Sequence, residues 1–303
     1  MSECILKVNN LTKLYNNVKV LDGVSFTIEQ GKIYGFIGEN GAGKTTTIRI
    51  LLGLSEATQG EIEILGQTER KQLEAARRKI GALVEKPILY DTLSAADNMK
   101  MQCILYGQEN TDIVSQLLEK VGLTNVKKKK VKDFSLGMKQ RLGIAMALVQ
   151  DPKLLILDEP VNGLDPMGMV DIRELLKSLN EEYGITIIIS SHILTELYQL
   201  ATDYIIINKG KIVELMTLEE LNDKCSKHIL IETEEVLKAT ETIRMKLETE
   251  NYKVSENAIK LYDCIDDVKN VAKILFDDGI LVTRFTVVGE NLEEYYIDLL
   301  GGK

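Results

Sequence analysis

The segment most suited to chemistry reads Gly38-Glu39-Asn40-Gly41-Ala42-Gly43-Lys44-Thr45 and fits the phosphate-loop pattern GxxxxGK[ST] in full. Its glycines let the backbone fold around an anion, and successive amide groups and the N-terminus of the following helix then point at phosphates. The Lys44 ammonium would reach the β- and γ-phosphates of a nucleotide, and the Thr45 hydroxyl would bind Mg²⁺. The segment predicts a site for ATP and Mg²⁺ whose nucleotide-binding residues are Gly38, Asn40, Gly41, Ala42, Gly43, Lys44, Thr45 and Thr46.

Two carboxylates follow an apolar run farther along the chain. The run Leu154–Leu157 predicts a buried strand, and Asp158 and Glu159 come directly after it. Ligands of parallel α/β sheets bind at the carboxyl ends of the strands, so both side chains would face the nucleotide. Asp158 would hold Mg²⁺ through water, and Glu159 would orient or deprotonate the attacking water. An Asp-Glu pair at a strand end is common by itself, and it indicates hydrolysis here because a phosphate loop precedes it.

The segment Phe134-Ser135-Leu136-Gly137-Met138-Lys139-Gln140-Arg141 resembles the signature sequence of ABC ATPases, whose common form is LSGGQ followed by a basic residue, Gln and Arg. In that family two cassettes pair head to tail, and ATP is held between the phosphate loop of one and the signature of the other. The resemblance implies that Ser135 and Gly137 contact the γ-phosphate. Leu136 stands where glycine is usual and Met138 where glutamine is usual, so neither is assigned a role. An N-cap by Ser135 at the start of a helix is compatible with this role.

Three further positions match the order of motifs in ABC ATPases. Asp165, in Asn162-Gly163-Leu164-Asp165-Pro166, resembles the acidic residue of the loop that contacts the opposite cassette beside the nucleotide. His192 follows the apolar strand Ile185–Ile189 and resembles the switch histidine that bonds the γ-phosphate and positions water. Tyr15 resembles the aromatic residue that stacks on adenine. The alternatives for the last two are a hydrogen-bonded histidine after a strand and an aromatic residue that only packs.

Glu85 follows the predicted strand Ile80–Val84, where the family usually has a glutamine that contacts Mg²⁺ and senses the membrane partner. A carboxylate is a competent ligand of Mg²⁺ or of its water, and it adds a negative charge near the metal. The predicted metal ligands are therefore Thr45, Glu85 and Asp158. The glutamate at this position, together with the C-terminal segment Glu290–Tyr296, resembles the cassettes of lantibiotic-immunity and bacitracin-type exporters.

The resemblance implies an ATPase subunit that powers a separate membrane permease and exports cationic peptide antibiotics, for self-protection or resistance. One phosphate loop and one signature in each chain imply that two complete sites need a homodimer, formed when ATP binds. Glu159 and His192 would be the catalytic residues. The alternative is a soluble ABC-type ATPase that acts on nucleic acid or ribosomes. Such proteins generally carry long coiled-coil insertions, zinc clusters or two cassettes in one chain, and this sequence shows none of these features.

The composition is that of a globular protein with an acidic balance, because 45% of the residues are hydrophobic, 27% are charged and the net charge is −9. This balance argues against nucleic acid, which proteins bind largely through Lys and Arg, and the run Lys127–Lys130 is interpreted as a solvated loop. No apolar run approaches the ~20 residues of a membrane span, and no secretory signal is found. The expected location is the cytoplasm, peripherally on the inner face of the cell membrane through the permease. The four scattered cysteines are expected to be reduced.

The elements that must position these residues are strands alternating with helices, most of the strands apolar throughout. This order predicts an α/β fold with a largely parallel sheet covered on both faces. Residues 1–220 are expected to form the ATP-binding cassette, a P-loop ABC ATPase fold with a sheet core and a helical lobe at about residues 86–150. Residues 228–303 read as strand, helix, strand, strand, helix, strand, helix, the order of a small α+β domain that resembles a split β-α-β unit.

Overall fold

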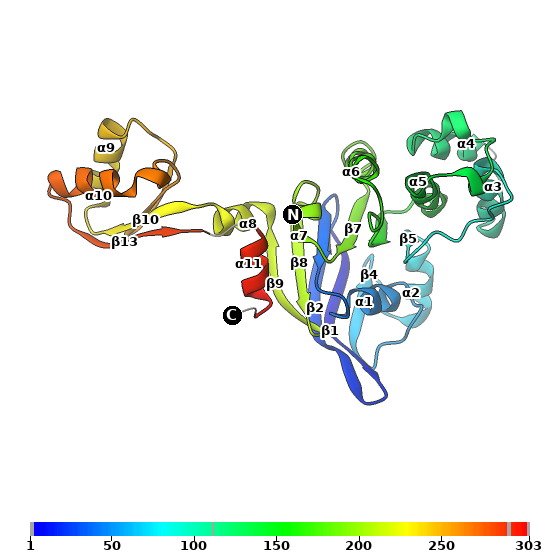
Figure 1. Ribbon diagram of the computed structural model, residues 1–303. Coiled ribbons are helices and arrows are strands. Elements are labelled where there is room, and N and C mark those ends of the chain that lie inside the picture. Colours follow the sequence, from blue (N-terminus) through cyan, green and yellow to red (C-terminus); the bar gives the residue numbers. More distant parts are fainter. Residues whose placement is uncertain (1–2, 111, 290–291, 302–303) are drawn as a thin grey trace. The chain divides into compact units, whose positions relative to one another are not determined.

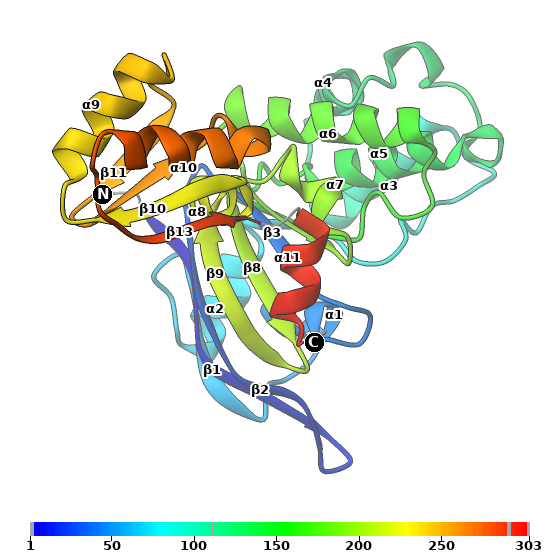
Figure 2. The ribbon, with the colours of Figure 1, turned by 60° about the vertical axis from the view of Figure 1, so that its left-hand side comes forward.

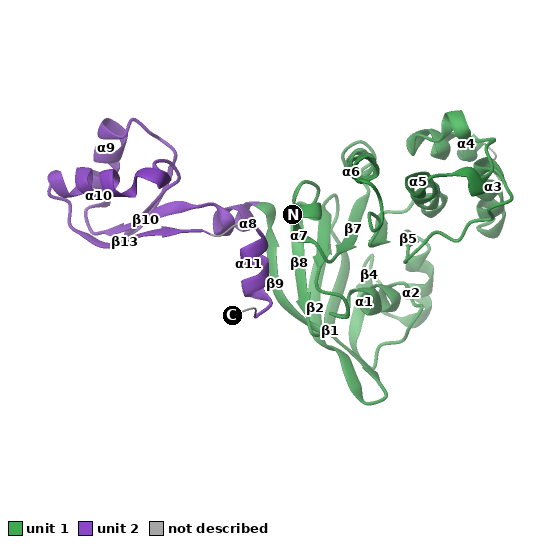
Figure 3. Cartoon of the chain, in the orientation of Figure 1, with its two compact units in different colours: residues 1–218 green, residues 219–303 purple. Residues whose placement is uncertain are grey.

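The computed structural model describes residues 3–110, 112–289 and 292–301, and the chain divides into two compact units. Unit 1 comprises residues 1–218 and unit 2 residues 219–303 (Figures 1 and 3). Glu290 and Asn291, which open the C-terminal segment discussed above, lie outside the described residues. None of the described helices has the length and apolar character that a membrane crossing needs. The four cysteines are free thiols, as expected.

A six-stranded sheet with the order β5-β6-β7-β3-β8-β9 forms the centre of unit 1 (Figure 1). Every neighbouring pair is parallel except β8 and β9. Strands β3 and β6 are nearly unbroken apolar sequences and are buried along their whole length, which confirms the predicted sheet with both faces covered. The strands are β3 (Ile33–Ile37), β5 (Ile80–Leu83), β6 (Leu154–Asp158), β7 (Thr186–Ser191), β8 (Asp203–Asn208) and β9 (Lys211–Thr217).

A second sheet of unit 1 is antiparallel and has the order β2-β1-β4, with strands β1 (Cys4–Tyr15), β2 (Val18–Glu29) and β4 (Gln59–Ile64). Figure 2 shows β1 and β2 as a long hairpin. Asn16 and Asn17 form its turn with φ of 47° and 65°, a conformation that asparagine tolerates. The apolar pattern of the first residues predicts a strand over Ile5–Val8 alone, but strand β1 continues to Tyr15, which is its last residue.

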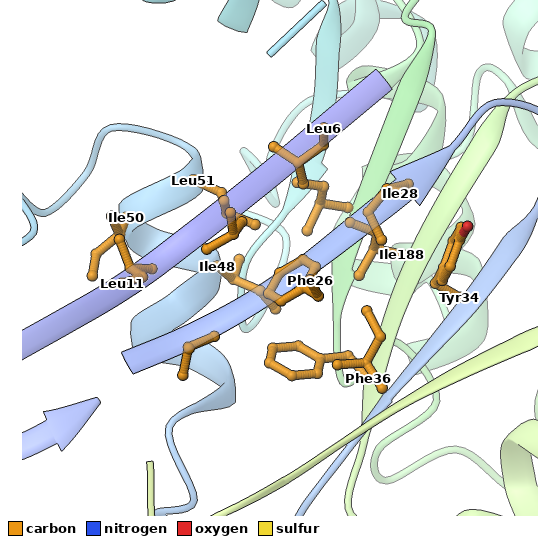
Figure 4. Packing of buried hydrophobic residues seen from close by; sticks show 14 of the residues in the cluster. Leu6, Leu11, Phe26, Ile28, Tyr34, Phe36, Ile48, Ile50, Leu51 and Ile188 are labelled. Carbon is orange, nitrogen blue, oxygen red and sulfur yellow. The ribbon is translucent and has the colours of Figure 1, made fainter. Parts of the chain in front are cut away.

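Helix α1 (Lys44–Leu51) contacts both sheets, through β2 on one side and β6 on the other. The core around it includes Leu11, Phe26, Phe36, Ile48 and Ile188 (Figure 4). Burying each such side chain contributes about 1.5–3 kcal/mol to stability. The start of α1, where the phosphate loop ends, is therefore fixed against both sheets. Helix α2 (Arg70–Arg77) follows β4 and packs against it.

Helices α3 (Ala95–Leu105), α4 (Asp112–Lys120) and α5 (Leu136–Ala147) contact one another and form the helical part between β5 and β6 (Figure 1). The side chain of Ser94 caps α3, and that of Ser135 caps α5. Short 3-10 turns at Thr124–Val126 and Val131–Asp133 lead into α5. The Lys127–Lys130 run between these turns is fully exposed, which confirms a solvated loop.

Helices α6 (Pro166–Glu181) and α7 (Leu194–Tyr198) pack against β7. The sequence pattern predicts a helix over Val170–Glu182, whereas α6 begins four residues earlier, at Pro166. Asp165 caps the helix by accepting a hydrogen bond from the backbone of Gly168, and Pro166 occupies the first turn, where a missing N–H costs nothing.

Unit 2 contains the antiparallel sheet β11-β12-β10-β13 and confirms the predicted element order. A strand from the second half of the unit lies between β10 and β11, which is the split β-α-β arrangement. Its core lies between this sheet and two helices, α9 and α10. The elements are α8 (Leu218–Cys225), β10 (His228–Thr233), α9 (Val236–Lys246), β11 (Tyr252–Ser255), β12 (Ala258–Leu261), a 3-10 turn (Ile265–Asp267), α10 (Val268–Asp277), β13 (Val282–Val288) and α11 (Leu292–Leu299).

One carboxylate ties α8 to the sheet of unit 2. Asp223 accepts hydrogen bonds from Lys260 at 2.6 Å, from Tyr262 at 2.8 Å and from Lys253 at 3.0 Å. These bonds, that of Lys260 first, hold the pKa of Asp223 well below its usual range. Burial, and then the bond to Asp223, raises the pKa of Tyr262 to about 12. Helix α8 is therefore attached to β11 and β12 through a charged network.

Candidate nucleotide site

The phosphate loop connects β3 to α1 at the edge of the main sheet where the parallel strands end. A Cβ on Gly38 would lie 2.4 Å from the carbonyl oxygen of Ile207, and one on Gly43 would lie 2.6 Å from Leu21 Cδ2. Gly43 also has φ +112°, which side chains disfavour, so both positions require glycine. Within the described structure no side chain caps α1 at Gly43. The amide groups of its first turn are thus available to an anion.

Lys44 is the buried cation of this loop, with only 5% of its side chain exposed. Its Nζ donates hydrogen bonds to the carbonyl oxygens of Gly38 at 2.6 Å and Glu39 at 3.2 Å. It also lies 3.5 Å from Glu159 Oε1. The ammonium is therefore held inside the loop, where a phosphate oxygen would meet it.

Asp158 ends β6 and is almost fully buried. Its Oδ1 accepts a hydrogen bond of 2.6 Å from Ser190 Oγ, which in turn accepts one of 2.9 Å from the backbone N–H of Glu159. Ser190 stands on the neighbouring strand β7 and fixes both acidic residues at once. Ser190 has no predicted role, because the sequence pattern of a strand does not reveal which hydroxyl group will bond a carboxylate on the neighbouring strand.

Glu159 follows β6 with φ +48° and is surrounded by polar groups from other segments. Its Oε1 lies 3.4 Å from His192 Nδ1 and 3.5 Å from Lys44 Nζ, and its Oε2 accepts a hydrogen bond of 3.0 Å from Asn162 Nδ2. The structure thus brings together three residues that the sequence singled out separately. The sequence interpretation did not identify Asn162 as a hydrogen-bond partner of Glu159. Its position three residues after Glu159 could have indicated this contact.

A cleft of about 740 Å³ opens beside these groups. This volume lies in the usual range of small-molecule sites. Thr45, Glu85 and Asp158, the three predicted metal ligands, all line it. Hydroxyl and carboxylate oxygens are ligands that Mg²⁺ accepts, and Mg²⁺ commonly takes one or two protein carboxylates and completes its shell with phosphate and water. The donor set therefore fits Mg²⁺ with a nucleotide. The other residues that line the cleft are Asn40, Lys86, Pro87, Leu89, Asp91, Leu136, Lys139, Gln140, Glu159, Asn162 and Gly163.

Of the predicted nucleotide residues, Asn40 and Thr45 line this cleft, and the four that lie outside the phosphate loop in sequence do not. Ser135 caps α5 by accepting a hydrogen bond of 3.2 Å from the backbone of Met138, and Gly137 lies in the first turn of that helix. Asp165 caps α6. Tyr15 is half exposed at the end of β1, and Lys13 Nζ lies 4.7 Å from its ring centroid. The signature segment contributes Leu136, Lys139 and Gln140 to the cleft, residues that received no role from the sequence.

Comparison with known proteins identifies the architecture that carries this site. A family model described as ABC transporter matches residues 21–162. The bacitracin transport ATP-binding protein of Bacillus licheniformis is 42% identical to this chain over 299 residues, which cover 98% of both proteins. The chain belongs to the ABC transporter family. It is an ATPase that binds ATP.

Two further relatives add information on this ABC ATPase. The lantibiotic transport ATP-binding protein of Streptococcus pyogenes is 48% identical over 232 residues, which cover 75% of this chain and 99% of that protein. A dimeric ATP-binding cassette solved with ADP and Pi has a TM-score of 0.62 and 27% identity, over 71% of this chain and 99% of that one. The predicted cassette fold is thereby confirmed. The shorter relative leaves a quarter of this chain unmatched, whereas the bacitracin relative matches nearly all of it.

Proposed function

We propose that this ABC ATPase powers the export of cationic peptide antibiotics through a separate membrane permease, with Mg²⁺ as its metal. The observation that carries the proposal is the similarity to a bacitracin transport ATP-binding protein along almost the whole chain, unit 2 included. The lantibiotic relative supports the same class of substrate. Glu85, a carboxylate where the family usually has glutamine, lines the cleft and agrees with this subfamily.

The residues at the strand ends would divide the work of hydrolysis. Lys44 and the amide groups at the start of α1 bind the phosphates. Glu159 orients and deprotonates the attacking water, and His192, 3.4 Å from it, bonds the γ-phosphate and keeps that water in line. Thr45, Asp158 and Glu85 would hold Mg²⁺ directly or through water, and the metal would supply positive charge that stabilises the transition state. Tyr15 stacks on the adenine ring.

A second copy of the chain would complete each site. Ser135 and Asp165 are exposed and do not line the cleft beside their own phosphate loop. Each is instead at the N-terminus of a helix, where backbone amides and the helix dipole favour an anion. The solved dimeric relative supports a dimer. The resemblance to ABC ATPases implies that the two cassettes pair head to tail, so that Ser135, Gly137 and Asp165 serve the nucleotide of the opposite cassette.

The permease would dock beside Glu85 and on the helical lobe at about residues 86–150. Large apolar side chains gather in this stretch without cover, and Ile88 is 90% exposed. Exposed apolar groups of this kind mark interaction sites. The remaining members are Tyr90, Ile104, Leu105 and Tyr106. Through this contact the chain would sit peripherally on the cytoplasmic face of the membrane, with no role for nucleic acid.

The test is affinity purification of a tagged Glu159→Gln chain from detergent-solubilised membranes of its host, with ATP and Mg²⁺. We expect a polytopic membrane protein in stoichiometric amount, because slowed hydrolysis prolongs the closed complex. A Lys44→Ala chain, which lacks the phosphate contact, is the matched control and should recover less of the same protein. Recovery with ribosomes or nucleic acid would favour the soluble ATPase. Host cells with Glu159→Gln should also become sensitive to bacitracin-type peptides, and unchanged resistance would contradict the assigned substrate class.

A further inference from the structure

A salt bridge at the rim of the cleft links Glu85 to helix α1. Arg49 Nη2 lies 2.5 Å from Glu85 Oε1. Arg49 stands four residues after Thr45 and therefore lies on the same face of α1, one turn farther along. The guanidinium thus links Glu85, on the loop after β5, to the helix that carries Thr45, another predicted metal ligand.

The backbone gives Glu85 a fixed direction. Glu85 has φ +61° and Glu159, in the corresponding place after β6, has φ +48°. Residues with a Cβ avoid this region, so each strand is followed by a sharp turn that presents a carboxylate at the sheet edge. Three groups then hold Glu159, namely Lys44, His192 and Asn162. In the described parts of the chain, Glu85 has one charged partner, Arg49, and its side chain is 62% exposed.

A lone carboxylate at this place would act on the nucleotide in two ways. It would repel the triphosphate, since like charges in a cleft interact over several ångströms. It would also compete for the metal, because carboxylate oxygens coordinate Mg²⁺ directly. Arg49 opposes both effects, since it cancels the charge and occupies Oε1 with a charge-assisted hydrogen bond. A glutamine would need no such counter-ion.

We propose that Arg49 is a positioning residue that holds the Glu85 carboxylate out of direct contact with the metal. Glu85 then reaches Mg²⁺ only through water, and the pair adds no net charge to the site. This inference rests on the Mg-ATP site proposed above, but not on the transported peptide or the permease. It makes Arg49 the residue that sets how tightly the metal is retained with bound nucleotide.

The experiment titrates Mn²⁺, a substitute for Mg²⁺ visible by electron paramagnetic resonance, into the purified full chain with saturating ADP. Four forms are compared: the unchanged chain, R49M, E85Q and R49M/E85Q. We expect R49M to tighten Mn²⁺ binding about 5–10-fold, because the freed carboxylate joins the metal ligands. The same change in the E85Q background should alter binding less than ~2-fold, since no carboxylate remains to be freed.

Two results would overturn the proposal. If R49M changed Mn²⁺ affinity equally with Glu85 and with E85Q, Arg49 would act through its charge alone. If R49M changed Mn²⁺ affinity in neither background, the bridge would be an ordinary surface ion pair. R70M is the matched control, because the exposed Arg70–Glu56 bridge lies outside the cleft, and it should leave Mn²⁺ binding unchanged. R49K, which keeps the charge, should fall between R49M and the unchanged chain, and thermal unfolding checks that each form is folded. No permease or peptide is present, so this result and the export test can fail independently.

Discussion

Unit 1 carries 27 acidic and 26 basic residues, a net charge of −1, whereas unit 2 carries 19 acidic and 11 basic residues, a net charge of −8. At one sheet edge of the nearly neutral unit, Lys44 Nζ and His192 Nδ1 lie 3.5 Å and 3.4 Å from Glu159 Oε1. The acidic unit uses Asp223 to fasten a helix to a sheet. On the proposed function, the charged groups at this sheet edge of unit 1 would serve a ligand, whereas Asp223 serves the fold of unit 2. The expected effects of their replacement differ accordingly.

The largest expected effect is on turnover in unit 1. Glu159→Gln should lower ATP hydrolysis ~100-fold or more, because the amide cannot accept the proton of the attacking water. The melting temperature should change by no more than about 2 °C, since the amide oxygen can still accept a hydrogen bond from one of the two donors, Asn162 or Lys44, that contact different oxygens of the carboxylate. A steady-state ATPase assay and a thermal melt check both parts. The control is Glu56→Gln, an exposed carboxylate outside the cleft, and near-normal turnover of Glu159→Gln would remove its assigned role.

The next effect concerns two tyrosines of unit 1, Tyr15 and Tyr183, that are equally exposed and each have a lysine over the ring. Lys13 lies over Tyr15 at 4.7 Å, and Lys120 lies over Tyr183 at 3.7 Å. Tyr15→Ala should weaken the binding of a fluorescent ATP analogue about 5–10-fold if the ring stacks on adenine, since base stacking contributes ~1–3 kcal/mol. Tyr183→Ala should leave this affinity unchanged. Equal affinities of the two variants would mean that Tyr15 only packs.

A moderate effect on stability is expected in unit 2. Asp223→Asn replaces a charged acceptor of three hydrogen bonds and should cost about 1 kcal/mol, because the group is partly exposed. A loss of this size lowers the melting temperature of a small unit by about 4–8 °C. ATP hydrolysis should stay within about 2-fold, in contrast to Glu159→Gln. Asp266→Asn, an exposed carboxylate of the same unit, is the control, and equal melting curves of the two variants would refute the structural role of Asp223.

The smallest expected effect is a pH dependence of the same unit. The pKa of Asp223 is lowered in the folded protein, chiefly by Lys260, so its stabilising contribution is complete above the pKa of an unfolded aspartate, about 4. The contribution then decreases as the pH falls below that value. Hydrogen exchange of the amides in β11 and β12 should become faster between pH 4 and pH 2, after correction for intrinsic rates. Asp223→Asn should show a smaller pH dependence, and an identical slope in both chains would exclude Asp223 as its source.

The sequence predicted most of the fold because the signals were strong and local. The run Leu154–Leu157 and the strand before His192 could only be buried strands, and the phosphate loop fixed the start of α1. The second half of β1 was missed, because bulges after Val8 and Leu11 interrupt the alternation on which the prediction depends. The early start of α6 was missed because Asp165 was interpreted only as part of a family motif and not as the N-cap of a helix.

The candidate site was predictable as a set of residues but not as a set of contacts. The motifs named Glu159, His192 and Lys44, and the structure places them together. The bonds of Ser190 to Asp158 and of Arg49 to Glu85 join strands and helices that lie far apart in sequence. Which of these side chains bond one another depends on the order of the strands in the sheet and on the direction of the backbone after each strand. A short stretch of sequence encodes neither. The metal, nucleotide and dimer roles of the named residues remain predictions for the experiments above.

The attachment of α8 through Asp223 also bears on how gene recombination could exchange unit 2. Because Lys253, Lys260 and Tyr262 all bond a residue of this helix, α8 belongs with the sheet of unit 2. A single recombination point before α8 would therefore move all four members of this network together.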